Sequence, residues 1–385
     1  MSGGYDGIVM APIAESAFAD LYVGSGADIH RGLEICAALA QAGLHPRVCL
    51  SPGAVQAVPP GTWVAAGGEV TAGDLTVPNG EAGQRVTVLA CAGPGETRWP
   101  SGLIPDVLVS TAPAGAWPDA VIPADPGHGG PAVTITAAAA RPAAPATYAV
   151  IVLDAVRYVL SRRNGPLTGK RLVVTGGGTR EPVDPVRFIT NRSSGRMGHA
   201  IADAARDYGA DVTLITSAPH LPAAVGVRCT GFDTVEALRA VVLAATARAD
   251  CLVMAAAVSD YRPASAADHK LKKSPGGLDL HLDTVPNFMS EIPPGVLRVG
   301  FAAETCADLE YVAGKRVSRG FDLICLNDVS RPDGGFEVDT NQITMVGPEG
   351  VLLSTDLLSK AEVARVLLGQ VAPLLAGRPA RESTR

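Results

Sequence analysis

The stretch RLVVTGGGTREPVDPVRFITNRSSGRMGHA, residues 171–200, decides the fold of the second half of the chain. It opens with a short apolar run at 171–175, which is typical of a strand buried on both faces of a parallel sheet. Three glycines follow this run, and a helix is expected at 198–208. A strand, a glycine-rich turn and a helix in this order predict the start of a βαβ arrangement.

The same rhythm continues toward the C-terminus. We expect further strands at 211–215, 251–255, 297–301 and 322–326, and helices at 234–247 and 307–319. Strands that alternate with helices predict a doubly wound, mostly parallel, Rossmann-like α/β sheet. Ligands of such sheets bind at the carboxyl ends of the strands, so the segments that follow the strands are where we expect a site.

Residues 1–147 have a different texture and are expected to form a smaller N-terminal α/β domain. Short elements are expected in it at 7–12, 29–44 (a helix), 85–91 and 106–110. Residues 137–146 are nearly all Ala, Pro and Arg, a composition that buries no helix or strand face and therefore predicts a linker. A helix at 148–162 then opens the second domain, residues 148–385.

The composition limits the function. The 385 residues are 47% hydrophobic and only 4% aromatic, so the cores must be built mainly from Ala, Val, Leu and Ile. A formal net charge of -6 argues against a general nucleic-acid binder, which needs a basic face. The seven cysteines form no CxxC pair or zinc-type cluster, and no apolar run approaches the roughly 18 residues of a membrane helix. We expect a cytoplasmic protein with reduced thiols and with neither nucleic acid nor membrane as a partner.

Glycines and polar donors crowd the segment after the first strand. The backbone of Gly177 and Gly178 could approach a phosphate closely and cradle it with N–H groups. The spacing is neither GxGxxG nor that of a Walker A loop, and a tight turn is an equal interpretation. Residues 184–198 add one Asn, two Ser and three Arg before the helix. That pattern favours an anionic ligand over a solvated loop in which Ser194 is only an N-cap.

Two later strand ends carry groups suited to a nucleoside. Small residues at 255–257 leave room for a flat ring, and Asp260 could accept hydrogen bonds from an exocyclic amine. Phe301 could stack on a base, and Lys315 and Arg319, four residues apart, share one helix face. A core alanine run and a core phenylalanine are the alternatives.

A basic run, Lys270-Leu271-Lys272-Lys273, lies beside a Pro-Gly-Gly turn. As a mobile loop it could close over a triphosphate, with each lysine acting as a point charge. Taken alone, such a run is more often a solvated face.

Together and in this order, the motifs resemble the ligase half of the bacterial bifunctional coenzyme A biosynthesis flavoprotein, a phosphopantothenate–cysteine ligase. That family carries G-G-T-R-E-P-x-D-P-V-R-F-I-x-N-R-S-S-G-x-M-G, A-A-V-x-D-Y-R-P, K-I-K-K, G-F-A-A-E-T, N-D-V and G-F-x-x-D-x-N. The matching blocks of this chain are 177–198, 256–263, 270–273, 300–305, 327–329 and 335–341. The resemblance spans about residues 167–368.

The resemblance implies an enzyme in which the carboxylate of 4′-phosphopantothenate attacks the α-phosphorus of CTP. The amine of L-cysteine then displaces CMP from the acyl-cytidylate. A carboxylate becomes a good electrophile only through such activation, and the enzyme positions both partners and stabilises developing negative charge. Mg²⁺ is implied to offset the triphosphate charge, with unknown ligands, and a homodimer is implied.

The resemblance also implies roles for individual residues. Catalysis is implied for Asn191 and Lys270. Contacts with CTP are implied for Gly177, Gly178, Ser193, Ser194, Asp260, Lys270, Pro286, Asn287, Phe288, Phe301, Lys315 and Arg319. Contacts with the acid substrate are implied for Arg187, Asn191, Arg192, Ala256 and Ala257.

The chain departs from the family at several positions. Arg319 stands where the better-known members have Lys, which keeps the charge but not the geometry. Val285 and Asn287 replace the first and last residues of the family's N-P-D, which leaves strict preference for CTP open. The first half lacks the family's G-G-I-A-A-Y-K loop, catalytic His and P-x-M-N motif, so neither FMN nor flavin decarboxylase activity is expected. Residues 1–147 are then a degenerate remnant of the flavin half or an unrelated domain.

Other functions stay open. A related ligase could join another acid and amine through an acyl-nucleotide, and the altered N-terminal half and N-P-D favour this. A nucleotide-binding protein without ligase activity is a second alternative, but the presence of Asn191, Lys270 and Lys315 together argues against it. A Rossmann oxidoreductase is disfavoured, because the sequence has no GxGxxG with a downstream acidic ribose contact.

Overall fold

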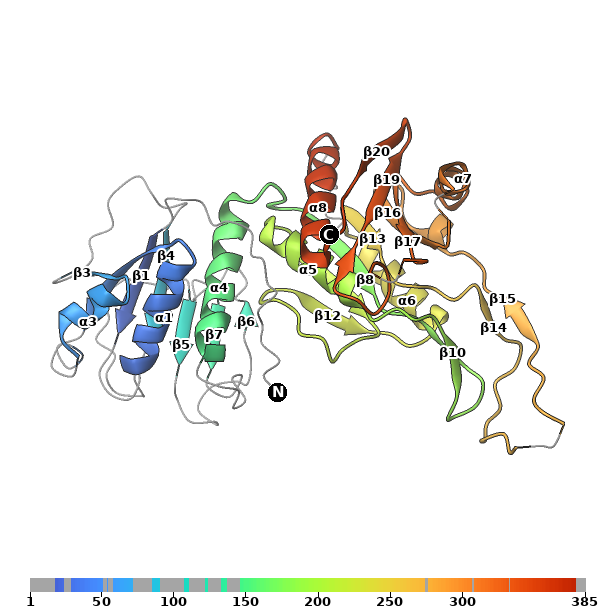
Figure 1. Cartoon of the computed structure of the whole chain (residues 1–385), viewed down its shortest axis with the longest axis horizontal. Helices are drawn as coiled ribbons and strands as arrows, with labels where there is room; N and C mark the ends of the chain where they lie inside the picture. Colours follow the sequence, from blue (N-terminus) through green and yellow to red (C-terminus); the bar gives the residue numbers. More distant parts are fainter. Residues whose placement is uncertain are drawn as a thin grey trace. The chain divides into compact units, whose positions relative to one another are not determined.

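The computed structural model describes residues 18–23, 29–50, 54, 58–71, 85–90, 107–110, 122–123, 133–136, 146–273, 276–306, 308–331 and 333–378. The chain forms two compact units that divide between Gly165 and Pro166 (Figure 1).

The N-terminal unit is built on a seven-stranded sheet. Its strands are β1 (Phe18–Val23), β2 (His45–Leu50), β3 (Glu69–Thr71), β4 (Arg85–Ala90), β5 (Val107–Ser110), β6 (Ile122–Pro123) and β7 (Val133–Thr136). The order is β3-β2-β1-β4-β5-β7-β6, and all neighbours are parallel except β6 with β7. Helix α1 (Ile29–Gln41) packs with α4 (Ala146–Asn164), and Trp63 of α3 (Pro60–Ala65) is fully buried. This unit confirms the predicted N-terminal α/β domain.

Helix α4 belongs to the N-terminal unit, whereas the sequence analysis began the second domain with it at residue 148. Its apolar side, including Val152, Ala155 and Val156, is buried, and the helix packs against α1. The division therefore follows the helix instead of preceding it. The expected stretch at 7–12 and the expected linker, apart from Ala146, lie outside the described residues.

The C-terminal unit contains an eight-stranded sheet. Its strands are β8 (Arg171–Gly176), β11 (Asp211–Thr216), β12 (Arg228–Gly231), β13 (Cys251–Met254), β16 (Leu297–Glu304), β17 (Leu323–Asp328), β19 (Ile343–Gly347) and β20 (Gly350–Ser354). The order is β12-β11-β8-β13-β16-β17-β19-β20, parallel from β12 to β17 and antiparallel thereafter. The predicted mostly parallel sheet is confirmed, and the antiparallel edge was not foreseen.

Helices cover both faces of this sheet. Helices α5 (Arg196–Asp207) and α8 (Lys360–Ala376) share one core cluster, and α6 (Val235–Thr246) and α7 (Leu309–Arg319) share the other. Alternate strand residues enter the two cores: Val174 lies in the first and Val173 in the second. This is the doubly wound arrangement that the sequence predicted. Within the described part of the chain, no helix has both the length and the apolar character to cross a bilayer.

Two antiparallel ribbons extend from the ends of the parallel strands. Strands β9 (Arg180–Pro182) and β10 (Phe188–Thr190) form a hairpin after β8. Strands β14 (Tyr261–Pro263) and β15 (Leu282–Thr284) form a ribbon after β13. A third short pair joins β18 (Thr340–Asn341) to β21 (Leu358–Ser359). The sequence analysis predicted none of these short strands.

A glycine contact sets the position of helix α5 against β8. A Cβ on Gly198 would lie 2.6 Å from Gly176 Cα and 2.7 Å from the Thr175 carbonyl oxygen. The helix begins after Gly195, which has φ 82° and provides no side-chain cap. The first N–H groups of α5 are therefore not capped by the side chain that precedes them.

Gly198→Ala should destabilise the C-terminal unit, because the added methyl group would meet backbone that cannot move without displacing the sheet. Overpacking of this kind costs about 1–3 kcal/mol. Gly314→Ala on helix α7 is the matched control, because a Cβ at residue 314 would have no neighbouring atom within 4 Å. Alanine should stabilise that helix slightly. Urea unfolding followed by circular dichroism measures both, and a Gly198→Ala protein as stable as the parent would contradict the contact.

Candidate functional site

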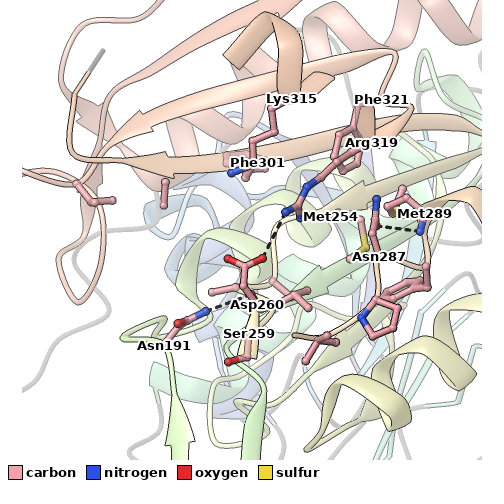
Figure 2. A pocket seen from close by; sticks show the side chains of 18 of the residues that line it. Asn191, Met254, Ser259, Asp260, Asn287, Met289, Phe301, Lys315, Arg319 and Phe321 are labelled. Carbon is pink, nitrogen blue, oxygen red and sulfur yellow. Dashed lines mark hydrogen bonds and ion pairs between the residues drawn. The ribbon is translucent and has the colours of Figure 1, made fainter. Parts of the chain in front are cut away.

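A pocket of about 540 Å³ lies at the carboxyl ends of the parallel strands (Figure 2). It adjoins the point where the strand order reverses, because β8 has β11 on one side and the later strand β13 on the other. Such reversals are the usual ligand sites of doubly wound sheets. The volume falls within the range of about 300–1,000 Å³ that is typical of small-molecule sites. The pocket is where the sequence analysis expected it.

Threonine hydroxyls fix the floor of the pocket. Thr175 Oγ1 accepts a hydrogen bond from the backbone N–H of Ala256 at 3.1 Å. Thr179 Oγ1 accepts one from the backbone N–H of Ser259 at 3.0 Å. Both threonines are fully buried. The loop after β13 is therefore tied to the end of β8 and not to solvent.

The ribbon of β14 and β15 brings two distant segments to one wall. Asp260 precedes β14 and Val285 follows β15, and the backbone N–H of Val285 donates to the Asp260 carbonyl at 2.9 Å. Asn287 comes two residues later, and its Oδ1 accepts from the backbone N–H of Met289 at 3.1 Å. Because that oxygen is engaged, the Asn287 amide offers mainly N–H donors to a ligand.

Two ion pairs join α7 to the mouth of the pocket. Arg319 Nη2 lies 3.3 Å from Asp260 Oδ1, and Lys315 Nζ lies 3.0 Å from Glu304 Oε1. Figure 2 shows Arg319 reaching from the helix toward Asp260. The Asp260 side chain is 72% exposed, so this pair is screened and adds little to stability. Either cation can leave its partner when an anionic ligand enters.

The deep wall of the pocket is apolar. It is lined by Met254, Phe288, Met289, Phe301 and Phe321. Aromatic and thioether side chains form a surface on which a flat ring can lie. The wall and the nearby Asp260 carboxylate together suit a planar base with an exocyclic amine.

Asn191 reaches the pocket from the β9–β10 hairpin. Its Nδ2 donates to the Val258 carbonyl at 3.4 Å, a long bond that leaves the amide free to turn. Gly178 makes room for this segment, since a Cβ there would lie 3.1 Å from the Asn191 carbonyl oxygen. The hairpin, which the sequence analysis did not predict, therefore places Asn191 beside the loop after β13.

A smaller pocket of about 70 Å³ adjoins the first and shares Ala256 and Ala257 with it. One side is the N-terminus of α5 with Ser193 and Ser194. The other side carries three polar side chains, Asn327, Asn341 and Lys360.

Asn327 and Lys360 determine the chemistry of this smaller pocket. Asn327 is 8% exposed, and its Oδ1 has no hydrogen-bond partner among the described residues. Lys360 Nζ donates to the Val338 carbonyl and retains two further N–H donors. Burial, with a smaller effect of Arg196, lowers the pKa of Lys360 to about 8, and Asp339 partly opposes this. A buried cation beside a helix N-terminus can hold an anion, and Asn327 can accept a hydrogen bond from it.

Most of the predicted site residues meet at these two pockets. The larger pocket is lined by Asn191, Arg192, Ala256, Ala257, Asp260, Pro286, Asn287, Phe288, Phe301, Lys315 and Arg319. The smaller is lined by Ser193 and Ser194, with Ala256, Ala257 and Phe301 again. Segments separated by more than one hundred residues thus form one continuous site.

Gly177 and Gly178 line neither pocket. The backbone N–H of Ala257 donates to the Gly177 carbonyl at 2.8 Å, and the Ala257 carbonyl accepts from Thr179 at 3.2 Å. Gly177 has φ 90° and packs against Ser217, whose Oγ would lie 2.1 Å from an added Cβ. The geometry shows that these glycines allow a tight turn to pack against Ser217 and the loop after β13, and their predicted contact with a nucleotide stays a prediction.

Arg187 and Lys270 also lie outside both pockets. Arg187 is paired with Asp184, and its Nη2 also donates to the Leu271 carbonyl at 2.8 Å. Lys270 is exposed in the lysine segment, residues 270–273. The predicted roles of these two residues in substrate binding and catalysis stay predictions.

Lys360 and Asn341 are site residues that the sequence analysis missed. A signal was present, because Ser359 and Glu362 have the S-x-x-E spacing of a capping box, and both of its hydrogen bonds form. The motif would have placed Lys360 at a helix N-terminus. It would not have shown that this helix end lies beside the strand ends of the same sheet.

Comparison with known proteins gives the family. Residues 167–374 match the family described as DNA/pantothenate metabolism flavoprotein C-terminal domain. The chain is 37% identical over 231 residues to the coenzyme A biosynthesis bifunctional protein CoaBC of Bacillus subtilis (strain 168), which covers 58% of this chain and 56% of that protein. It is 34% identical over 215 residues to a cysteine/cysteine sulfinic acid decarboxylase from an unknown prokaryotic organism, covering 54% of this chain and 60% of that protein.

A solved structure of the C-terminal domain of a coenzyme A biosynthesis bifunctional protein CoaBC is also similar. It is 32% identical, has a TM-score of 0.47, and the match covers 55% of this chain and 99% of that one. The family match extends over more than half of the chain, and the chain therefore belongs to this family. The chain spans about half the length of the curated relatives it matches, and the residues that match the family, 167–374, lie in the C-terminal unit.

Lys360→Met should weaken the binding of inorganic phosphate roughly ten- to hundredfold, because a charge-assisted hydrogen bond is lost. In the parent protein, phosphate affinity should fall as the pH rises through about 8, where Lys360 loses its proton. Calorimetric titration at several pH values measures both effects. Lys170→Met, which removes a cation that lines neither pocket, is the control. Equal phosphate affinity in parent and Lys360→Met would exclude an anion at this position.

Proposed function

We propose that the chain is a ligase of coenzyme A biosynthesis that joins 4′-phosphopantothenate to L-cysteine through an acyl-cytidylate formed from CTP. The observation that carries this proposal is the junction of the two pockets at Ala256 and Ala257. An acid with a phosphate at one end and a carboxylate at the other can occupy both pockets at once. Membership of the family and the names of its similar relatives support the same reaction.

The nucleotide would occupy the larger pocket. Its base would lie against the apolar wall, with Asp260 accepting from the exocyclic amine and Asn287 donating to a ring acceptor. Its phosphates would draw Lys315 and Arg319 away from Glu304 and Asp260. The Arg319–Asp260 pair is exposed, so its exchange costs little free energy.

The acid would enter with its phosphate in the smaller pocket. Lys360 would supply a positive charge, the N-terminus of α5 would supply N–H groups, and Asn327 Oδ1 would accept from a phosphate hydroxyl. The carboxylate would then point past Ala256 and Ala257 toward the nucleotide. The small side chains leave space for that passage.

The chemistry is two successive displacements. A carboxylate oxygen forms a bond to the α-phosphorus and pyrophosphate leaves with its electron pair. The deprotonated cysteine amine then attacks the acyl carbon and CMP leaves. Asn191, beside the junction and weakly held by Val258, would donate to the acyl oxygen as negative charge develops there.

Magnesium would accompany the nucleotide. Among the described residues, no three or more His, Cys, Asp or Glu side chains gather at a position suited to a metal ion. Magnesium at nucleotide sites is held mainly by phosphates and water with one or two carboxylates, so Glu304, once Lys315 has turned to the phosphates, would be a sufficient protein partner. The ion would offset the charge on the triphosphate.

The test is release of pyrophosphate from CTP and Mg²⁺ in the presence of phosphopantothenate and cysteine. The proposal expects release only when the acid is present, with amide formed once cysteine is added. Asn191→Asp should still release pyrophosphate but accumulate the acyl-cytidylate, because amide formation loses its neutral donor. Chromatography of quenched reactions measures both. Absence of any acid-dependent release by the parent protein would refute the proposed reaction.

A different acid and amine remain the alternative, because a similar relative carries the name of a cysteine/cysteine sulfinic acid decarboxylase. The same assay separates this alternative. Binding of CTP without release on phosphopantothenate, followed by release with another acid, would assign the chain to another pathway.

We further propose that the chain acts as a homodimer. Apolar side chains of the two ribbons and of the chain that leads into β15 are exposed, namely Phe188, Tyr261, Leu280 and Leu282, and exposed apolar surface can mark an interface between proteins. Leu282→Glu should shift the protein to monomer in sedimentation equilibrium. Val351→Glu, on exposed strand β20, is the control and should leave the mass unchanged. A parent protein that sediments as a monomer would end this proposal.

A further inference from the structure

The turn between β9 and β10 contains a buried carboxylate that the proposed function does not use. Asp184 Oδ1 accepts from the backbone N–H of Val186 at 2.8 Å and of Arg187 at 2.9 Å. Its Oδ2 accepts from Arg187 Nε at 2.9 Å, from Arg187 Nη2, and from the backbone N–H of Leu271 at 3.1 Å. The Asp184 side chain has 0% exposed area. Such complete coordination indicates a fixed charge with a structural task.

The partner of this turn is the lysine segment, 87 residues later in the chain. Arg187 Nη2 donates to the Leu271 carbonyl at 2.8 Å. Leu271 is therefore held at both of its backbone polar groups, by Asp184 and by Arg187. The backbone N–H of Ala267 also donates to the Val183 carbonyl at 3.0 Å, which attaches the approach to the segment.

The clamp, Asp184 with Arg187, holds the one apolar residue of a strongly cationic segment. Lys270, Lys272 and Lys273 are exposed, and none of the three has an ion-pair partner among the described residues. Three like charges in four residues repel one another and would favour an ensemble of spread conformations. Fixing the backbone at Leu271 opposes that spreading before any ligand arrives.

The charge of the clamp is permanent. The Arg187 guanidinium and the backbone donors hold the pKa of Asp184 well below its usual range, against the opposing effect of burial. An amide at this position could not substitute for the carboxylate. Its N–H donors would face the donors of Arg187 and of the backbone.

We propose that Asp184 is a positioning residue that, through Arg187 and Leu271, preorders the lysine segment as a cationic surface for the polyphosphate of the nucleotide. The identity of that ligand rests on the proposed function, whereas the clamp itself does not. Ordering the segment during folding spares the entropy that a disordered segment would lose on binding.

The first experiment tests whether the clamp holds the lysine segment in place, and it does not depend on enzymatic activity. Asp184→Asn should raise the rate of tryptic cleavage after residues 270, 272 and 273 about tenfold, since hydrogen bonds that hold the segment are lost. Leu271→Pro removes the N–H that reaches Asp184 and should also raise cleavage after residues 272 and 273, whereas the bond between residues 270 and 271 becomes resistant to trypsin. Asp233→Asn removes an exposed carboxylate paired with Arg180 at 3.5 Å on the same hairpin and should leave cleavage unchanged. Peptide mass spectrometry gives the three rates.

The second experiment reads the consequence for the nucleotide. In Asp184→Asn and Leu271→Pro the KM for CTP should rise about tenfold, while kcat changes less than twofold, because binding and not chemistry is affected. Asp184→Glu should recover part of the affinity. Unchanged cleavage and unchanged KM in a folded Asp184→Asn protein would overturn the proposal, and so would a fall in kcat at constant KM.

The two proposals fail in different ways. If the parent protein shows no CTP-dependent release of pyrophosphate, the proposed function is wrong, and the cleavage rates still decide whether the clamp exists. Leu271→Pro leaves both side chains of the clamp in place. If pyrophosphate is released but this variant is cleaved by trypsin after residues 272 and 273 at the rate of the parent, and binds CTP like the parent, the positioning role is wrong. A melting temperature for each variant shows that it is folded before either comparison.

Discussion

The close approach of helix α5 to the end of β8 is the contact on which the rest of the site depends. Because Gly176 and Gly198 lack side chains, the helix axis lies near enough for its first turn to border the smaller pocket. Any Cβ at Gly198 would strike backbone, so a substitution displaces the element and not a side chain. A separate glycine, Gly178, leaves space for the Asn191 segment. Two close backbone approaches therefore set the two ends of the proposed acid site.

The parallel sheet could be predicted from the sequence because each of its central strands has a recognisable local sequence pattern. Strands β8 and β13 are buried on both faces and read as continuous apolar runs. The β14–β15 ribbon gives no such signal, since its strands have three residues each and are mostly exposed. The pairing of its strands is set by the backbone hydrogen bond between Asp260 and Val285, which are distant in the sequence. Short exposed strands depend on such long-range contacts, and a local sequence pattern cannot predict them.

The candidate site could be predicted to the extent that its residues follow strands. Asp260 lies in the loop after β13 and Phe301 in the C-terminal half of β16, near the strand ends where chemistry in this fold class is expected, and both line the larger pocket. Lys360 begins a helix that follows the last strands, and only the packing of α8 against α5 brings it to the α5 N-terminus. Gly177 and Gly178 show where a local pattern is ambiguous. A glycine cluster after a strand is compatible with phosphate binding and with a tight turn, and the structure shows the tight turn.

Two parts of the site differ in burial. The hydrogen bonds of Thr175 and Thr179 in its floor are buried, whereas the Asp260–Arg319 ion pair at its mouth is exposed. Leaving the hydrogen bonds of Thr175 and Thr179 unmade would cost about 1–3 kcal/mol each in the buried floor. The Asp260–Arg319 pair at the mouth is solvent-exposed, and such pairs contribute about 0–1 kcal/mol. A ligand can therefore replace the partner of Arg319 at little cost, whereas it cannot displace the loop after β13. When a nucleotide binds here, Arg319 can turn toward its phosphates, while the loop after β13 keeps the geometry that it has in the folded protein.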